Sequence, residues 1–147
     1  MIDRDAMVRQ LRLHEGEWLK PYRCTAGKLT IGIGRNLDDR GITREESAYL
    51  LANDIAAEER ELLRALPWVA TLDEVRQRVL LDMAFNMGIV GLLGFKRTLA
   101  TIQAGDYQAA ATMMLDSRWA KQVGQRAERL SRMMATGKDP RELWPPS

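Results

Sequence analysis

Cysteine and histidine are almost absent from this sequence, which has one of each among its 147 residues. A single cysteine cannot form an intramolecular disulfide, so packing must stabilise the fold. The one histidine, His14, has no partner residues at metal-ligand spacing, and we therefore expect no metal ion and no other cofactor. Disulfide-stabilised scaffolds and metal-dependent enzymes are thereby excluded.

Long apolar runs are also missing. No run approaches the roughly 18–20 residues that span a bilayer, so we expect no stable membrane association. The first five residues are polar and carry no basic leader followed by an apolar stretch, so we expect no signal peptide and synthesis in a cytoplasm.

Acidic residues are scarce in one part of an otherwise balanced chain of net charge +2. Residues 118–132 hold five basic side chains and a single acid, Glu128. A local basic face suits a polyanion such as nucleic acid, lipid headgroups or an acidic wall polymer, and its simpler interpretation is a solvated helix face. The basic residues are Arg118, Lys121, Arg126, Arg129 and Arg132.

Apolar residues make up 46% of the sequence and are spread along it, which is typical of one globular domain at this length. Only one region has the pattern of β-structure. Residues 22–24 and 28–33 predict two short strands, joined by a turn at residues 25–27. Because glycine weakens a strand, Gly32 and Gly34 indicate that something approaches the backbone closely.

The remainder of the chain predicts helices. Asp3 or Asp5 can cap a first helix that has apolar residues at helical spacing and ends at Gly16. Glu15 then lies at the negative end of the helix dipole, where a carboxylate is disfavoured by up to about 1 kcal/mol. A carboxylate kept at such a position is a candidate functional group. The apolar positions are Met7, Val8, Leu11 and possibly Trp18.

The later helices are predicted from capping residues at their starts and helix-breaking residues at their ends. Residues 36–41 predict a loop, and the capping box Thr43/Glu46 opens a helix that runs to about residue 65. A second strong helix begins near residue 71 with five inward-facing positions and ends at Gly88. Shorter helices are expected at residues 96–104, 106–115, 117–122 and 125–136. The inward positions are Val75, Val79, Leu80, Met83 and Ala84.

The spacing of Glu15, Cys24 and Thr30, followed by Thr-Ile-Gly-Ile-Gly-Arg at residues 30–35, resembles the phage-type lysozymes (glycoside hydrolase family 24). Four further segments are similar to that family in the same order, so the resemblance covers nearly the whole chain. They are Ala84–Gly88, Gly94-Phe95, Ser117–Trp119 and Arg126–Arg129.

The resemblance implies a mostly α, α+β lysozyme-like fold in one domain of residues 1–147. A small β-lobe (about 15–42) and a larger helical lobe (about 66–144 plus the first helix) would be joined by a long helix (about 43–65), with the cleft between the lobes. The division into a β-region and a helical body agrees with the pattern of the residues themselves.

The resemblance also implies the catalytic roles. Glu15 would be the general acid that cleaves the β-1,4 bond between N-acetylmuramic acid and N-acetylglucosamine, and Thr30 would hold the attacking water. Cys24 stands where many relatives have aspartate. A thiol has an ordinary pKa of about 8.5, which a neighbouring carboxylate would raise. We therefore expect a mostly neutral Cys24 that positions water, and its roles as base or nucleophile stay open.

Other positions are expected to support the substrate or the acid. Phe85 and Asn86 are candidates for sugar stacking and amide recognition, with a core aromatic and a helix-end polar residue as the simpler interpretations. Thr98 lies where the family has a saccharide contact. Arg126 or Arg129 is expected to pair with Glu15 across the cleft, and Arg126 is the preferred candidate.

The predicted function is that of a monomeric endolysin acting on peptidoglycan glycan strands. It would stay in the host cytoplasm until a holin-like pore released it to the wall. Three alternatives are weighed: a lytic transglycosylase on the same polymer, a nucleic-acid-binding module using the basic residues, and an inactive relative retained in a virion. The intact Glu15 disfavours an inactive relative. A nucleic-acid-binding module would leave the β-region without a purpose, so we expect no nucleic-acid partner.

Overall fold

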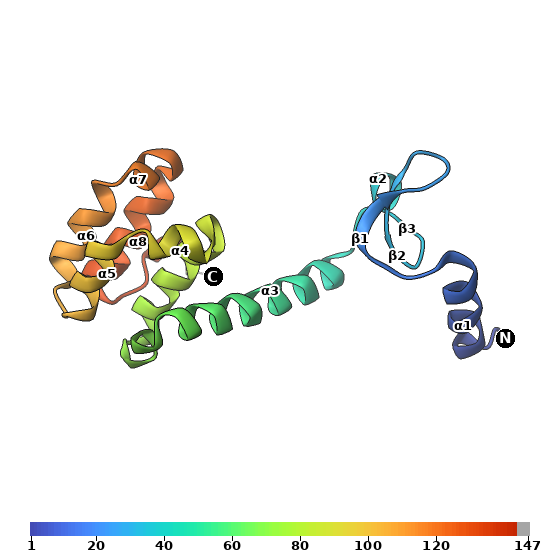
Figure 1. The fold of residues 1–147 in the computed structure, drawn as a ribbon, viewed down its shortest axis with the longest axis horizontal. Coiled ribbons are helices and arrows are strands. Elements are labelled where there is room, and N and C mark those ends of the chain that lie inside the picture. The colour runs from blue at the N-terminus through green and yellow to red at the C-terminus, as the bar shows by residue number, and fades with distance from the viewer. Residues whose placement is uncertain (144–147) are drawn as a thin grey trace. The chain divides into compact units, whose positions relative to one another are not determined.

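The structure is a computed structural model that describes residues 1–143. Its chain divides into two compact units, residues 1–51 (unit 1) and residues 52 onward (unit 2). The small sheet lies in unit 1 and the large hydrophobic core in unit 2, which gives the expected mostly helical, lysozyme-like α+β class (Figure 1). The predicted grouping of the first helix with the helical lobe, and the predicted cleft, stay predictions.

Unit 1 consists of a helix, a three-stranded antiparallel sheet and the start of a long helix. The first helix is capped by Asp3, whose carboxylate accepts a hydrogen bond from the N–H of Ala6 at 3.0 Å. The elements are α1 (Arg4–Glu15), β1 (Trp18–Arg23), β2 (Leu29–Gly32), β3 (Arg35–Asn36), α2 (Leu37–Arg40) and the first residues of α3 (Arg44–Ala65).

The sheet has the order β1-β2-β3, with Thr30 of β2 opposite both Tyr22 and Asn36. A bulge between Trp18 and Tyr22 interrupts the pairing of β1 with β2. Pro21 lies within β1, whereas the sequence placed the strand after it. Because β1 is an edge strand, a residue without an N–H is tolerated there.

Two expectations for unit 1 are wrong. Trp18 begins β1 instead of extending the first helix, because Gly16 ends that helix with a φ of 73°. Residues 36–41 are not a plain loop: Asn36 ends β3 and caps the short helix α2 by accepting from the N–H of Asp39 at 3.0 Å. An asparagine that can cap at this position is the signal that the prediction missed.

The predicted capping box at the start of α3 is present. Thr43 accepts a hydrogen bond from the N–H of Glu46 at 3.1 Å, and the Glu46 carboxylate accepts from the N–H of Thr43 at 2.8 Å. The same carboxylate pairs with the guanidinium of Arg35 at 2.8 Å. The end of the sheet is therefore tied to the first turn of α3.

This ion pair predicts a pH-dependent stability. The hydrogen bond from Arg35 lowers the pKa of Glu46 to about 2 from its ordinary value of 4.5. The resulting stabilisation is fully present above pH 4.5 and is lost as the pH falls through about 2, since protonation breaks the pair. We expect Glu46→Gln to flatten the decline in the free energy of unfolding between pH 5 and pH 2. Urea titrations at several pH values measure it, and an unchanged slope would contradict it.

Unit 2 is a helical bundle around one hydrophobic core, to which every one of its helices contributes (Figure 1). The fully buried side chains come from α4, α8 and the short helices between them, and also from Leu62 near the end of α3 and Val69 in the 3-10 turn that follows it. The elements are the remainder of α3, a 3-10 turn (Pro67–Thr71), α4 (Glu74–Leu93), α5 (Lys96–Gln103), α6 (Tyr107–Leu115), α7 (Arg118–Val123), α8 (Gln125–Thr136) and a second 3-10 turn (Arg141–Leu143).

The predicted boundaries in unit 2 hold to within about two residues, except that α4 begins at Glu74 and not near residue 71, because residues 67–71 form a 3-10 turn and Asp73 is the cap. Gly88 ends the first part of α4, as predicted: its φ of 82° and ψ of 157° are not helical, and a second helical segment follows this kink directly and runs to Leu93. The predicted inward face is confirmed for four of its members, which are fully buried, while Val75 packs partly buried against the core. The four are Val79, Leu80, Met83 and Ala84.

One buried arginine joins the two ends of this bundle. The Arg76 side chain, only 13% exposed, donates from Nε to the carbonyl of Met134 at 2.7 Å and from Nη2 to that of Ala135 at 3.1 Å. Its guanidinium also pairs with Asp73 at 3.0 Å and lies 3.6 Å from the ring centroid of Tyr107. Arg76 thus caps the C-terminus of α8 from the first turn of α4.

No single helix within residues 1–143 is long and apolar enough to span a bilayer; α4 and α5 meet those criteria only as a pair bent by 106°.

Candidate active site

The proposed acid lies at the end of α1. Glu15 is the last residue of the helix, as the sequence predicts, and the N–H of Gly16 bonds to the carbonyl of Arg12 at 3.0 Å. Its side chain extends over the turn between β2 and β3. Glu15 Oε2 lies 3.2 Å from the point where a Cβ on Gly34 would stand. The predicted close approach to the glycine-rich strand is therefore real at Gly34, and the group that approaches is Glu15.

Thr30 lies in the middle of the sheet and is 3% exposed. Its hydroxyl donates a hydrogen bond to the carbonyl of Lys28 at 2.9 Å. Since a hydroxyl has one proton, this bond leaves the oxygen lone pairs to accept a hydrogen bond from another group. Thr30 is thus suited to hold a water molecule by accepting one of its protons.

Cys24 lies at the end of the hairpin that joins β1 to β2. Its N–H bonds to the carbonyl of Lys28 at 3.0 Å, and the N–H of Gly27 bonds to the Cys24 carbonyl at 2.8 Å. The guanidinium of Arg23 donates to the Gly27 carbonyl at 3.1 Å and closes the turn. The thiol is free and partly exposed.

The predicted direction of the Cys24 shift is wrong. Hydrogen bonds with the backbone of Lys28 and then of Ala26 are the largest causes that hold the pKa of the Cys24 thiol below its ordinary value. The sequence-based reasoning considered only a neighbouring carboxylate, whereas the turn around the sulfur supplies the larger effect. The turn favours the thiolate, although partial burial opposes it.

The register of the sheet orders the three catalytic candidates along β2. Cys24 lies beside Lys28 at one end, Thr30 lies in the middle, and Glu15 lies over Gly34 beyond the other end. All three belong to unit 1. The arrangement offers a carboxyl group, a hydroxyl that can accept from water, and a thiol whose ionisation is favoured. Within residues 1–143, no three His, Cys, Asp or Glu residues are grouped to hold a metal ion.

The candidates for sugar contact lie in unit 2. Phe85 is 45% exposed, so it is not a core aromatic. The neighbouring Asn86 accepts a hydrogen bond through Oδ1 from the indole of Trp119 at 2.9 Å. Trp119 in turn packs edge-on against Phe95. The sequence missed this support, which fixes the side-chain amide of Asn86.

Two other candidates have partners or surroundings of their own. Thr98 is 7% exposed in α5, which leaves little of its surface for a sugar. Arg126 pairs with Asp82, with its Nε 2.8 Å and its Nη2 2.7 Å from the same carboxylate oxygen. Asp82 could not be predicted as its partner, because the two residues are 44 positions apart. The predicted pairing of Arg126 with Glu15 joins residues of different units and stays a prediction, as does saccharide contact by Thr98.

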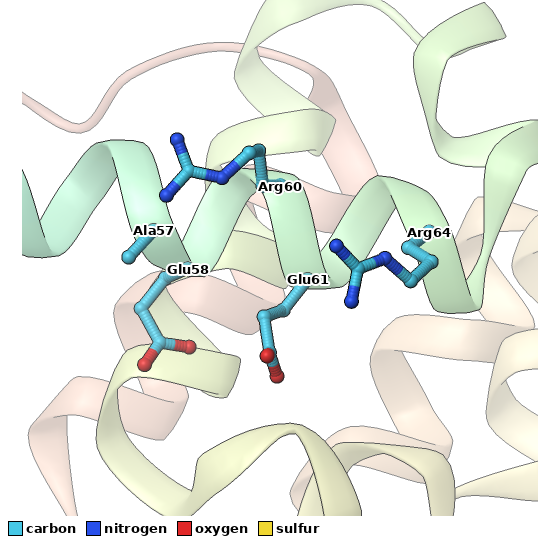
Figure 2. A pocket seen from close by; sticks show the side chains of 5 residues that line it. All are labelled: Ala57, Glu58, Arg60, Glu61 and Arg64. Atoms are coloured by element: carbon cyan, nitrogen blue, oxygen red, sulfur yellow. The ribbon is translucent and has the colours of Figure 1, made fainter.

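An open hollow of about 390 Å³ lies along the outer surface of α3 in unit 2. It contains none of the predicted site residues, and Figure 2 shows Glu58 and Glu61 projecting from the same side of the helix. Two acids and two arginines balance its charge. Its lining is Ala57, Glu58, Arg60, Glu61 and Arg64.

The mostly helical architecture, with Thr30 in a small antiparallel sheet, Cys24 in its first turn and Glu15 at the end of the preceding helix, defines a lysozyme-like protein. Comparison with known proteins makes the assignment specific: residues 12–135 match the Phage lysozyme family. The chain belongs to this family.

Three relatives show the range of proteins that carry such a domain. The chain is 30% identical to the pre-baseplate central spike protein Gp5 of Enterobacteria phage T4, over 90% of this chain but only 28% of the spike protein. It is 29% identical to a probable T4-type lysozyme of Dictyostelium discoideum, over 86% of this chain and 92% of that protein. It is 28% identical to an endolysin of Acyrthosiphon pisum secondary endosymbiont phage 1, over 76% of this chain and 75% of that protein.

Proposed function

We propose that this protein hydrolyses the β-1,4 bond between N-acetylmuramic acid and N-acetylglucosamine in bacterial peptidoglycan. The observation that supports this most directly is that Cys24, Thr30 and the side chain of Glu15 follow one another along β2 in a phage lysozyme family member. Family membership supports a peptidoglycan-lysing enzyme in general, and the residues present indicate the chemistry of the step.

In the proposed reaction, the protonated carboxyl of Glu15 gives its proton to the glycosidic oxygen as the C–O bond breaks. Water adds to the anomeric carbon while it donates a hydrogen bond to the Thr30 oxygen, whose own proton is held by the Lys28 carbonyl. The proton that this water loses on addition passes to bulk solvent, from which the Glu15 carboxylate regains the proton it gave to the leaving oxygen. Such a reaction uses a second group beside the acid. We assign Cys24 to positioning this water.

The experiment that tests the reaction is analysis of the products from purified peptidoglycan. Hydrolysis gives reducing ends, whereas a lytic transglycosylase gives 1,6-anhydro ends by attack of a sugar hydroxyl. We expect reducing ends only, identified by mass spectrometry. Anhydro ends would replace the hydrolase with the transglycosylase.

The role of Cys24 gives a second prediction. Serine keeps a hydrogen-bonding group at this position, so Cys24→Ser should slow wall lysis by less than about 10-fold, whereas loss of a general base costs roughly 10²–10⁴-fold. Turbidity assays on cell walls measure the rates, with Thr25→Ser, an exposed residue of the same turn, as the control. A collapse of Cys24→Ser to the level of a Glu15 variant would assign the thiolate a direct chemical role.

We further propose that the protein acts as an endolysin that lyses the host and reaches the wall through a holin-like pore. The similarity to a phage endolysin supports this setting. A monomer would suffice, because unit 1 carries all three catalytic candidates. Lysis of a host expressing the chain with a holin, but not without one, would test it.

The match to the phage T4 spike protein favours a second setting, in which the domain is part of a virion and opens the wall from outside. Product analysis cannot separate the two settings, but detection of the chain in purified virions would. A nucleic-acid-binding role has less support, because Arg126 and Arg132 of the basic segment are paired with Asp82 and Glu142.

A further inference from the structure

The turn between β2 and β3 contains a glycine whose missing side chain matters. Gly34 has φ +75°, and a Cβ built on it would lie 3.2 Å from Oε2, 3.3 Å from Cδ and 3.4 Å from Cγ of Glu15. Real Cβ atoms rarely come that close to their neighbours. The carboxyl group of Glu15 therefore occupies the space that any other residue at position 34 would need.

Gly32, two residues earlier, provides a natural comparison. Its backbone is similar, with φ +68°, but a Cβ built on it meets no atom within 4 Å. Both positions favour glycine because of their positive φ. Only at Gly34 does the absence of a side chain also make room for another group.

The Glu15 side chain has few other restraints in its own unit. Among the described residues of unit 1, no hydrogen bond or ion pair holds its carboxylate. Its position at the end of α1 leaves several rotatable bonds between the helix and the carboxyl group. The space left by the missing Cβ of Gly34 is thus the local feature that fits the observed place of the carboxyl group.

We propose that Gly34 is a positioning residue for the reaction, because its lack of a side chain leaves the space that the carboxyl group of Glu15 occupies. This inference rests on the proposed function, in which Glu15 is the acid. A side chain at position 34 would push the carboxyl group out of line with the glycosidic oxygen. Displacements of this kind, of about 1 Å or less, can cost up to roughly 10²-fold in rate.

The test compares Gly34→Ala with Gly32→Ala, since both variants force alanine into a positive-φ position and only one of them meets Glu15. We expect similar falls in the melting temperature. For Gly34→Ala we expect kcat on peptidoglycan to fall about 10- to 100-fold with KM within about 2-fold, and we expect Gly32→Ala to keep its kcat. The carboxyl-carbon NMR signal of Glu15 should move in Gly34→Ala alone.

A stability cycle keeps the test decisive if Gly34→Ala folds poorly. In a Glu15→Ala background the contact is gone, so Gly34→Ala should lower the melting temperature less than it does in the wild-type background, whereas the effect of Gly32→Ala should not change. Equal effects of Gly34→Ala in both backgrounds would overturn the inference. So would equal kcat losses in the two glycine variants, or an unmoved Glu15 signal.

The two proposals fail separately. Full activity of Glu15→Gln would show that Glu15 is not the acid. The positioning role of Gly34 would then have no bearing on catalysis. If Gly34→Ala and Gly32→Ala lose the same amount of kcat while Glu15→Gln is inactive, the positioning role of Gly34 is disproved and the proposed function stands.

Discussion

Glu15→Gln is expected to reduce wall lysis by at least about 10²- to 10⁴-fold, the contribution that a positioned general acid usually makes. Glutamine has the shape of glutamate and fits the space over Gly34, but it cannot give a proton to the leaving oxygen. The loss corresponds to roughly 3–5 kcal/mol in the activation free energy. Initial rates of turbidity decrease on purified walls measure it.

The matched control is Glu17→Gln, two residues further along the chain. Glu17 is a surface carboxylate that lies 3.5 Å from Arg12, so neutralising it changes the same net charge without touching the sheet. We expect wild-type rates from this variant and the same helical circular dichroism from both. Comparable activity in Glu15→Gln would eliminate Glu15 as the acid.

Arg76→Met is expected to lower the free energy of unfolding by about 2–4 kcal/mol. Methionine keeps much of the apolar stem but leaves the last carbonyls of α8, at Met134 and Ala135, without their donors. It also leaves Asp73 unpaired and removes the cation over Tyr107. Urea unfolding followed by circular dichroism measures the change.

Arg132→Met is the control for this variant. Arg132 belongs to α8 as well, but its side chain is 60% exposed and makes one ion pair, with Glu142. Exposed pairs contribute about 1 kcal/mol or less, so we expect a correspondingly small change. Equal losses from the two substitutions would show that the buried guanidinium has no special part in joining α4 to α8.

Features encoded by neighbouring residues could be predicted from the sequence. The caps at Asp3 and Thr43, the position of Glu15 at a helix end, and the four buried positions of α4 all depend on spacings of a few residues. The error at Trp18 has a local cause of the same kind, because Gly16 ends the first helix before that residue. The break at Gly88 was predictable, whereas the helical segment that follows it directly was not.

Features that depend on distant partners could not be predicted. Arg76 meets carbonyls 58 and 59 residues away, and Arg126 meets Asp82 across 44 residues. The Cys24 prediction failed for another reason. The shift in the pKa of the Cys24 thiol depends mainly on how the backbone around the sulfur is oriented, and this orientation cannot be inferred from the charged neighbours alone. The glycine pattern predicts that some group approaches the backbone near Gly34, but it does not identify that group as Glu15.

The carboxylate of Glu46 has a consequence for the order of folding. A single oxygen, Oε1, accepts from the N–H of Thr43 and from the guanidinium of Arg35, which are 3 and 11 residues away in the sequence. Closing such short loops costs little chain entropy. Winding of the first turn of α3 and docking of strand β3 can therefore occur together and early, before the chain finds contacts as remote as that of Arg76 with Met134. The sheet that carries Thr30 would then be assembled on a helix start that is already in place.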